Sequence, residues 1–189
     1  MWEALAYFEV VLRNSMDIQL RQWNAHQGTA TGGFHSSAWC LDPAPYLSSI
    51  VGPELSKATG NAQKALTAKH GSSAPLPSHD DVLAQTTLGL WRFLLPSKSQ
   101  GKQLLWIQCL QHAFPHRGRT PEMLAASVYQ VHKLRNRLAH LEPVFALNLV
   151  AYHVNMQNVI SEIDPDLGNW FTGVTNGLRA QIKTKPTFS

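Results

Sequence analysis

The feature that most constrains the fold is an apolar stripe with helical spacing in residues 120–141. Thr120-Pro121-Glu122 has the composition of a helix start: a hydroxyl that can cap, a proline at the first position, and a carboxylate at the positive end of the helix dipole. The apolar residues that follow are Leu124, Val128, Val131, Leu134, Leu138 and Leu141. On an ideal helix they lie within an arc of about 140°. We therefore expect a helix to about residue 140 with its apolar face in the core.

Helical patterns recur along the rest of the chain. Residues 2–24 carry a stripe of large apolar side chains at spacings of three and four, and residues 26–37 form a glycine-punctuated loop. Further helices are expected over 53–69, 82–95, 102–114, 143–163 and 170–182, with Gly60-Asn61 interrupting the first and Asp80 or Asp81 capping the second. Residues 70–77 are expected to be a linker and 183–189 a frayed tail. Strand signals are few, so the sequence predicts a single all-α domain over 1–189.

The charge content favours association with a second copy of the chain. Charged residues make up 15% of the sequence, whereas roughly 25% is typical of soluble domains. So few charges suggest that part of the surface is covered, and we expect a homodimer. The net charge of +4 favours a polyanionic partner such as nucleic acid or an anionic membrane, although ordinary variation in isoelectric point explains it equally well.

Several classes of protein are disfavoured by the sequence. Cys40 and Cys109 stand alone, without the paired spacing of a zinc site or a disulfide framework, so we expect buried free thiols and no metal. No apolar run reaches the roughly 18 residues of a membrane span, and charged residues interrupt the N-terminal stripe, unlike a signal peptide. The expected location is the cytoplasm, with no membrane partner and no cofactor.

Residues 134–144 concentrate the chemistry of the chain. Arg135, Asn136, Arg137, His140 and Glu142 lie within eight positions and are followed by a proline. Arginine offers a fixed fork of donors to a phosphate, and histidine can move a proton near neutral pH. Attack of a ribose 2′-hydroxyl on its own 3′-phosphate needs only such a base and such a clamp, without a metal. The competing explanation is structural, because basic residues also stabilise the C-terminal end of any helix.

The projection of this helix separates two of these groups. Arg135 falls inside the apolar arc, whereas His140 lies about 140° away around the axis and Asn136 lies between them. An arginine in an apolar arc must be paired or must line a water-filled cleft. Either the helix end is deformed before Pro143, or the site combines these residues from two copies of the chain.

The same residues resemble the signature of the HEPN superfamily. In that family an arginine followed by a polar residue precedes a histidine by four to six positions at a helix end, as in Arg135-Asn136-Arg-Leu-Ala-His140. The Abi-like proteins of bacterial abortive infection are similar over more of the chain, from residue 8 to about 170. Their E-x-x-x-R-N segment resembles Glu9, Arg13 and Asn14, and the segments 81–91 and 105–115 follow in a fitting order. This sequence differs in having Leu141 where relatives commonly have a second histidine.

The resemblance implies a dimeric helical bundle with metal-independent endoribonuclease activity on single-stranded or looped RNA, often as a toxin or antiphage effector under a cognate antitoxin. It assigns catalysis to Arg135, Asn136 and His140. Substrate contacts are expected from surrounding basic side chains: Arg117, Arg119, His132, Lys133 and Arg137. Supporting roles are expected for Glu9, Arg13, Asn14 and Glu142. The alternatives are a non-catalytic module that binds RNA or a protein, and a purely structural dimer in which Arg135 pairs with an acid such as Glu9.

Overall fold

The computed structural model describes residues 1–96 and 100–178, and in this part of the chain every regular element is helical. An isolated β-bridge between Gly28 and Phe34 closes the loop that follows the first helix. The elements in chain order are α1 (Trp2–Asn24), α2 (Pro45–His70), η1 (Gly71–Ser73), α3 (His79–Ala84), α4 (Leu88–Leu94), α5 (Gln100–Gln108), η2 (Leu110–Ala113), α6 (Pro121–Ala139), α7 (Leu149–Ile163) and α8 (Pro165–Val174). The predicted all-α class is confirmed. None of these described helices is both long and apolar enough to cross a bilayer.

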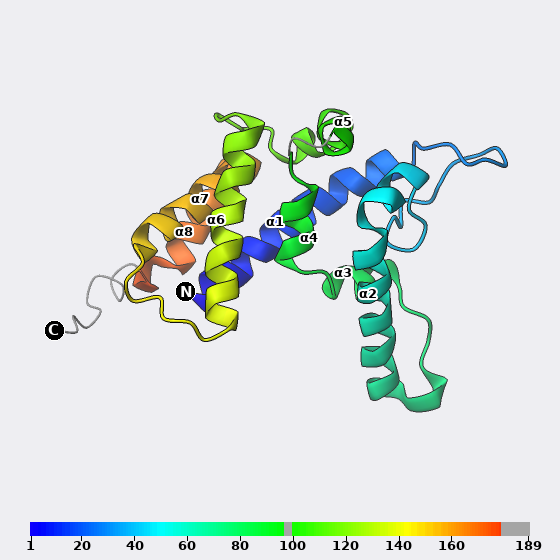
Figure 1. The fold of residues 1–189 in the computed structure, drawn as a ribbon, viewed down its shortest axis with the longest axis horizontal. Coiled ribbons are helices and arrows are strands. Elements are labelled where there is room, and N and C mark those ends of the chain that lie inside the picture. The colour runs from blue at the N-terminus through cyan, green and yellow to red at the C-terminus, as the bar shows by residue number, and fades with distance from the viewer. Residues whose placement is uncertain (97–99, 179–189) are drawn as a thin grey trace.

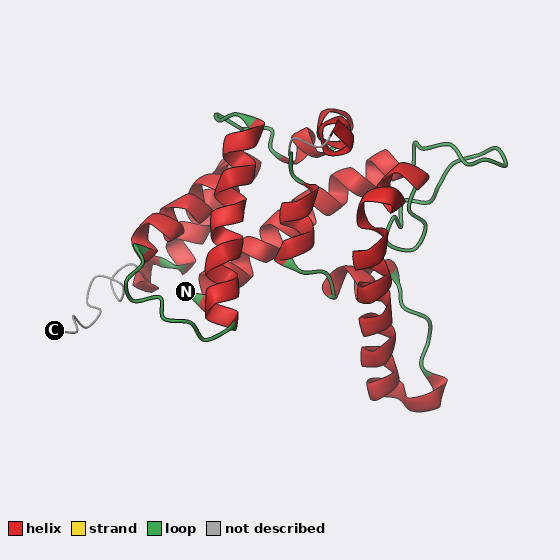
Figure 2. Ribbon diagram, viewed as in Figure 1, coloured by secondary structure: helices red, strands yellow, loops and turns green. Residues whose placement is uncertain are grey.

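Helix α1 is the axis of the molecule. It runs between the group formed by α6, α7 and α8 and the group formed by α2 and α3, with α4 lying across its middle (Figures 1 and 2). Its predicted stripe is exposed at Trp2 but buried over the rest of its length at spacings of three and four: Leu5, Phe8, Leu12, Met16 and Leu20. Because this stripe contacts α4, α6 and α7, the first helix forms the core on which the others pack.

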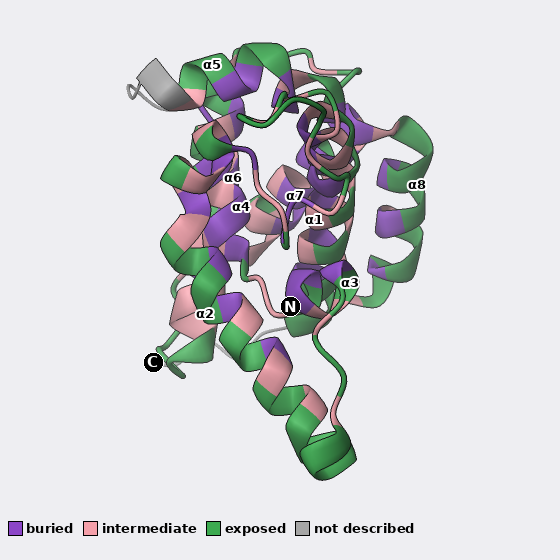
Figure 3. Ribbon diagram, turned by 90° about the vertical axis from the view of Figure 1, so that its right-hand side faces the viewer, coloured by how far each residue is buried: buried purple, intermediate pink, exposed green. Residues whose placement is uncertain are grey.

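Two other helices have contrasting surroundings. Helix α6 buries Leu124, Val128, Val131 and Leu134, and Thr120 Oγ1 accepts the N–H of Met123 at 3.3 Å, so the predicted helix and its cap are confirmed. The prediction is wrong for Leu141, the last residue of the expected apolar face, which is exposed because the helix ends at Ala139. The C-terminal half of α2 instead extends away from the other helices and is largely exposed (Figure 3).

Helix α2 differs from its prediction in two ways: it starts earlier, and it has no interruption. It begins at Pro45, eight residues before the expected start at Pro53, and continues through Gly60 without interruption. Proline has no backbone N–H, but the N–H at the first helical position has no partner within the helix. A proline is therefore well tolerated there, which favours Pro45 as the start. Packing of a buried stripe that passes Pro53 then stabilises the rest of the helix: Leu47, Val51, Leu55, Ala58 and Ala62.

The helix expected over 82–95 is two helices. The cap of α3 is Ser78, whose hydroxyl accepts the N–H of Asp81, while the Asp81 carboxylate accepts the N–H of Ser78 at 2.9 Å. The chain then breaks before α4. Thr86 Oγ1 donates to the carbonyl of Leu83 at 2.7 Å and accepts the indole N–H of Trp91 at 3.1 Å. These side-chain hydrogen bonds compete with the helical pattern and separate α3 from α4.

Three later boundaries also differ from their predictions. The helix expected over 102–114 ends at Gln108 and continues only as η2. Helix α7 starts at Leu149 rather than at Pro143, because Asn148 Oδ1 caps it by accepting the N–H of Ala151 at 3.0 Å. The last helix starts at Pro165 rather than at residue 170, since the Asp164 carboxylate accepts the first free N–H groups. The predicted tail over 183–189 lies outside the described residues.

Candidate functional site

The C-terminal end of α6 closes in a Schellman motif. The N–H of Glu142 donates to the carbonyl of Arg137 at 2.8 Å, and the N–H of Leu141 donates to the carbonyl of Leu138 at 3.0 Å. Leu141 has a φ of 56°, in the left-handed region where glycine is the usual residue. The distortion expected before Pro143 is therefore an ordered helix end at residues 140–142.

Arg137 and Glu142 hold this helix end together. Arg137 Nε lies 3.2 Å from Glu142 Oε2, at an angle that does not make a hydrogen bond, and its Nη2 donates to the carbonyl of Pro143 at 3.0 Å. Arg137 is a predicted substrate contact and Glu142 a predicted supporting residue. In this chain they are paired with each other, which leaves only part of the Arg137 guanidinium for a ligand.

His140 is exposed directly after the last helical residue of α6, and Leu141 beside it is 90% exposed. On the helix, His140 shares a face with Tyr129, Lys133 and Asn136, which recur at spacings of four, three and four within about 60° of arc. Two of the predicted catalytic residues, Asn136 and His140, thus lie on the same side of α6. This face is called the His140 stripe below.

Arg135 lies on a different side of α6, half-buried toward α1. Burial raises the pKa of Glu9 on α1, while the nearby charge of Arg135, a hydrogen bond from the Leu88 N–H and the charge of Arg13 lower it by a smaller total amount. In the described part of the chain, no ion pair joins Arg135 to Glu9. Glu9 therefore accepts a hydrogen bond at the start of α4 and provides Arg135 with a counter-charge at longer range.

The two central groups stay apart within one chain. Helix α6 remains regular through Ala139, so Arg135 and His140 are separated by about 140° around its axis, as the sequence predicts. Of the two explanations left open, a change of backbone conformation at the helix end does occur, but its left-handed residue is Leu141, which follows His140. A site that takes Arg135 from one copy and His140 from another stays a prediction.

His132 and Asn136 contact each other on successive turns. Asn136 Nδ2 lies 3.4 Å from His132 Nε2. Burial lowers the pKa of His132, and the charges of Arg92 and Arg135 lower it further, so the imidazole is neutral at neutral pH. A neutral Nε2 accepts the amide N–H of Asn136 and fixes the orientation of that amide. His132, predicted to bind substrate, thus orients a predicted catalytic residue.

Arg92 and Tyr129 extend the site beyond the predicted residues. The Arg92 guanidinium of α4 lies 4.9 Å from the ring centroid of Tyr129 on α6, and Lys133 Nζ lies 5.1 Å from the same ring. Tyr129 is 42% exposed. The spacing of four between Tyr129 and Lys133 is a signal in the sequence, but Arg92 sits in an apolar segment 37 positions before Tyr129, and only the packing of α4 on α6 joins them.

Two predicted substrate contacts lie at the other end of α6. Arg119 Nε donates to Glu162 Oε1 at 2.6 Å and its Nη1 donates to Ser127 Oγ at 2.6 Å. Arg117 lies 5.0 Å from the ring centroid of Trp106. The Arg119 guanidinium lies beside Ser127, about 12 Å of helical rise before Arg135. Within one chain, these arginines are therefore not part of the His140 end of the helix.

The remaining supporting residues lie on α1. Arg13 Nε donates to Asn14 Oδ1 at 3.4 Å, and its charge lowers the pKa of Glu9 one turn earlier. Arg13 and Asn14 also line a hollow of about 470 Å³ that includes Asp17 and Arg21. They are adjacent to the Glu9–Arg135 region but do not contact the His140 stripe in any described interaction.

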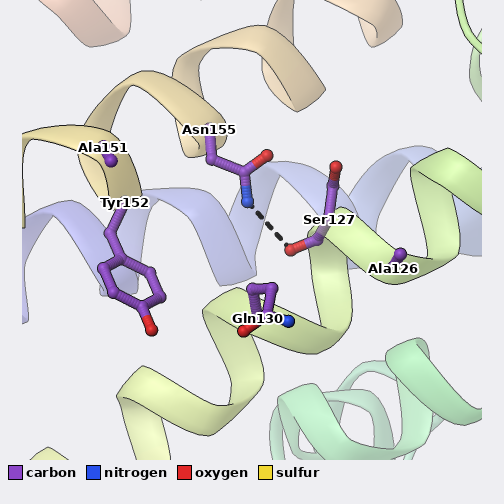
Figure 4. A pocket seen from close by; sticks show the side chains of 6 residues that line it. All are labelled: Ala126, Ser127, Gln130, Ala151, Tyr152 and Asn155. Atoms are coloured by element: carbon purple, nitrogen blue, oxygen red, sulfur yellow. Dashed lines mark hydrogen bonds between the residues drawn. The ribbon is translucent and has the colours of Figure 1, made fainter. Parts of the chain in front are cut away.

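A separate groove between α6 and α7 contains none of the predicted residues. Its volume is about 340 Å³, and its lining includes Ser127 and Gln130 of α6 and Tyr152 and Asn155 of α7 (Figure 4). Asn155 Nδ2 donates to the carbonyl of Ser127 at 2.9 Å. Because this groove has no titratable group other than a tyrosine, it is a poorer candidate for proton transfer than the His140 end.

Neither a metal-binding group nor a similar known protein is found for the described part of the chain. Within residues 1–96 and 100–178, no group of three or more histidine, cysteine or acidic side chains is arranged to hold a metal ion. Comparisons with protein families, with curated proteins and with solved structures give no match.

Proposed function

We propose that this chain is a metal-independent endoribonuclease of the HEPN type that acts as a homodimer on single-stranded or looped RNA. The observation that carries the proposal is the position of His140, exposed at the end of α6 on the same face as Asn136 and Lys133. A histidine held on an ordered helix end beside an amide and an ammonium group is suited to proton transfer next to a phosphate.

The proposed reaction is an internal transfer at the scissile phosphate. His140 removes the proton of the ribose 2′-hydroxyl, and O2′ attacks the adjacent phosphorus. The bond from phosphorus to O5′ breaks, the leaving O5′ takes a proton from water, and a 2′,3′-cyclic phosphate forms. Arg135 neutralises the developing charge on the non-bridging oxygens, and Asn136, oriented by His132, donates to the same phosphate.

In this proposal Arg135 and His140 of one site come from different copies of the chain. The separation of about 140° around α6 prevents them from converging on one small group within a chain. A mixture of Arg135→Ala and His140→Ala chains tests this directly. If the site is shared, mixed dimers contain one intact site and regain activity, whereas a site built within each chain stays inactive in every dimer.

Cleavage is tested by incubating the purified protein with total RNA in EDTA. We expect discrete products from the wild-type chain and none from His140→Ala. His116→Ala is the matched control, because His116 is also exposed but lies before the start of α6. An identical pattern from wild type and His140→Ala would rule out catalysis through this site. The proposed biological role, a toxin or antiphage effector restrained by an antitoxin, requires that expression of the wild-type chain arrests growth.

The second candidate is a non-catalytic module of the same fold that binds RNA or a protein. The observation that favours it is the half-buried position of Arg135 near Glu9, where less of the guanidinium is open to a phosphate. For RNA, it predicts binding that weakens steeply with salt and leaves no cleavage product.

A further inference from the structure

Three of the four cation–aromatic contacts in the described structure occur on the surface shared by α4, α5 and α6. Arg92 and Lys133 both lie over Tyr129, and Lys102 Nζ lies 3.2 Å from the ring centroid of Phe93. Such contacts occur about once per 70–80 residues in ordinary structures. Their concentration on one surface gives it alternating cations and aromatic rings. We call these five residues the α4–α6 ridge.

The cations of the ridge have no acidic partners among the residues that the structure describes. In the described part of the chain, Arg92, Lys102 and Lys133 form no ion pair with any carboxylate. Burial lowers the pKa of Lys102 and of His132, and the charge of Arg92 lowers both further, so Arg92 lies close to both groups. Glu9, the acid on the neighbouring α1, accepts a hydrogen bond from the Leu88 N–H and has Arg135 and Arg13 as its nearby charges. A bound polyanion would offset the positive charges of the ridge.

The rings of the ridge are available to a ligand. Tyr129 is 42% exposed and Phe93 is 37% exposed, so each residue is partly open to solvent beside a cation. Aromatic side chains next to basic groups are the elements with which proteins hold single-stranded nucleic acid, because the bases stack on the rings while the phosphates contact the cations. A duplex hides its bases and does not use such rings.

The ridge is continuous with the proposed catalytic residue. Tyr129 and Lys133 are the first members of the His140 stripe, so the same face of α6 leads from Arg92 to His140. The rise from Tyr129 to His140 is about 16 Å along the helix. A strand that follows this face would meet the cation–aromatic contacts first and His140 at its end.

We propose that the α4–α6 ridge is a binding track for single-stranded RNA, with bases stacked on Tyr129 and Phe93 and phosphates on Arg92, Lys102 and Lys133. This assignment deepens the proposed ribonuclease function, on which it rests for the choice of RNA over other polyanions.

The test measures binding apart from cleavage. Fluorescence anisotropy follows a labelled oligouridine of about 12 nucleotides bound to the His140→Ala chain in EDTA over a series of salt concentrations. We expect Arg92→Gln/Lys133→Gln to weaken binding at low salt and to reduce the slope of log K against log salt by about 1.4, since each single-strand phosphate contact contributes roughly 0.7. Tyr129→Leu should weaken binding about tenfold with little change in slope, and Tyr129→Phe should retain it.

The matched control is Lys57→Gln/Lys64→Gln, which removes the same charge from exposed positions on α2 and should leave binding close to that of the parent chain. If Arg92→Gln unfolds the chain, Lys133→Gln alone serves, because Lys133 is exposed on α6. Equal binding by the ridge variant and the control overturns the proposal. Equal or tighter binding of duplex RNA, or of vesicles rich in anionic lipid, also overturns it. If the wild-type chain does not cleave RNA but binding still depends on the ridge residues, only the nuclease proposal is contradicted.

Discussion

Asp17 of α1 and His79 of α3 face each other in the core, with His79 Nε2 3.0 Å from Asp17 Oδ1. The same carboxylate accepts the indole N–H of Trp39 at 2.7 Å and the Nε–H of Arg21 at 2.7 Å. Burial raises the pKa of Asp17, but hydrogen bonds from His79, Arg21 and Trp39 lower it by more, so the net pKa is below the ordinary value of 3.8. This buried anion connects α1, α3 and the loop that precedes α2.

Asp17→Asn is expected to destabilise the fold by about 3 kcal/mol, because it removes the charge that Arg21 faces and one acceptor within a buried network. Urea denaturation at neutral pH measures the loss. Asp80→Asn is the control, since Asp80 pairs with the same Arg21 but its side chain is 80% exposed, and it should change stability little. The stability contributed by Asp17 is fully present above pH 3.8 and is lost as pH falls through its lower folded pKa. Equal losses in the two variants would contradict this account.

Gly168→Ala is expected to destabilise the fold by about 2 kcal/mol, because α7 and α8 pack too closely for a side chain there. A Cβ at Gly168 would lie 2.0 Å from Ser161 Oγ and 3.1 Å from Ser161 Cα. Gly173→Ala lies on the same helix with nothing within 4 Å of the added carbon, and should be neutral or stabilising. Thermal melts of both variants test the prediction. Ser161→Gly should recover part of the loss in the double variant, and an absence of coupling would count against the contact.

Leu141→Gly is expected to stabilise the fold by about 0.5–1 kcal/mol. A non-glycine residue in the left-handed region costs about 1–2 kcal/mol, which exceeds the extra entropy that glycine loses on folding. Leu141→Ala keeps the backbone penalty and removes only an exposed side chain, so its stability should match the wild type. Chemical denaturation separates the variants. A stability order in which alanine and glycine are equal would show that the left-handed backbone carries no strain.

Arg119→Ala is expected to destabilise the fold by about 3 kcal/mol, because it leaves the largely buried Glu162 without its cation. Arg117→Ala should lose far less, since it removes only a contact with Trp106. Urea denaturation compares the two. If Arg119 instead serves the predicted role in substrate binding, Arg119→Ala would keep wild-type stability and lose RNA affinity.

Arg92→Gln is expected to raise the pKa of His132, because it removes one of the two cations that oppose protonation of the imidazole. Titration of the histidine signals by NMR measures the shift, with Arg117→Gln as a control that should not move it. In the wild type, the folded pKa lies below the ordinary 6.5, so stability from the neutral imidazole is present above pH 6.5 and declines as pH falls toward the folded pKa. An unchanged His132 pKa in Arg92→Gln would show that the charge of Arg92 does not affect protonation of the imidazole.

Local signals predicted the helices in which a start signal and an apolar stripe agree. Helix α6 has both: the start signal Thr120-Pro121 and the buried apolar residues that follow it. Helix α1 has no side-chain cap, but its apolar stripe is long enough to predict the helix. The separation of Arg135 and His140 around α6 also followed from the sequence, because the angle per residue is a property of any regular helix.

Only the tertiary structure decided where other helices begin and what the site residues contact. Thr86 ends α3 through hydrogen bonds to Leu83 and Trp91. Leu141 ends α6 in the left-handed backbone conformation, which a leucine rarely adopts. Arg119 pairs with Glu162 43 positions away, and Arg92 reaches Tyr129 from another helix. Such partners are chosen by the packing of whole helices, whose free energy is shared among many contacts and leaves no local pattern in the chain.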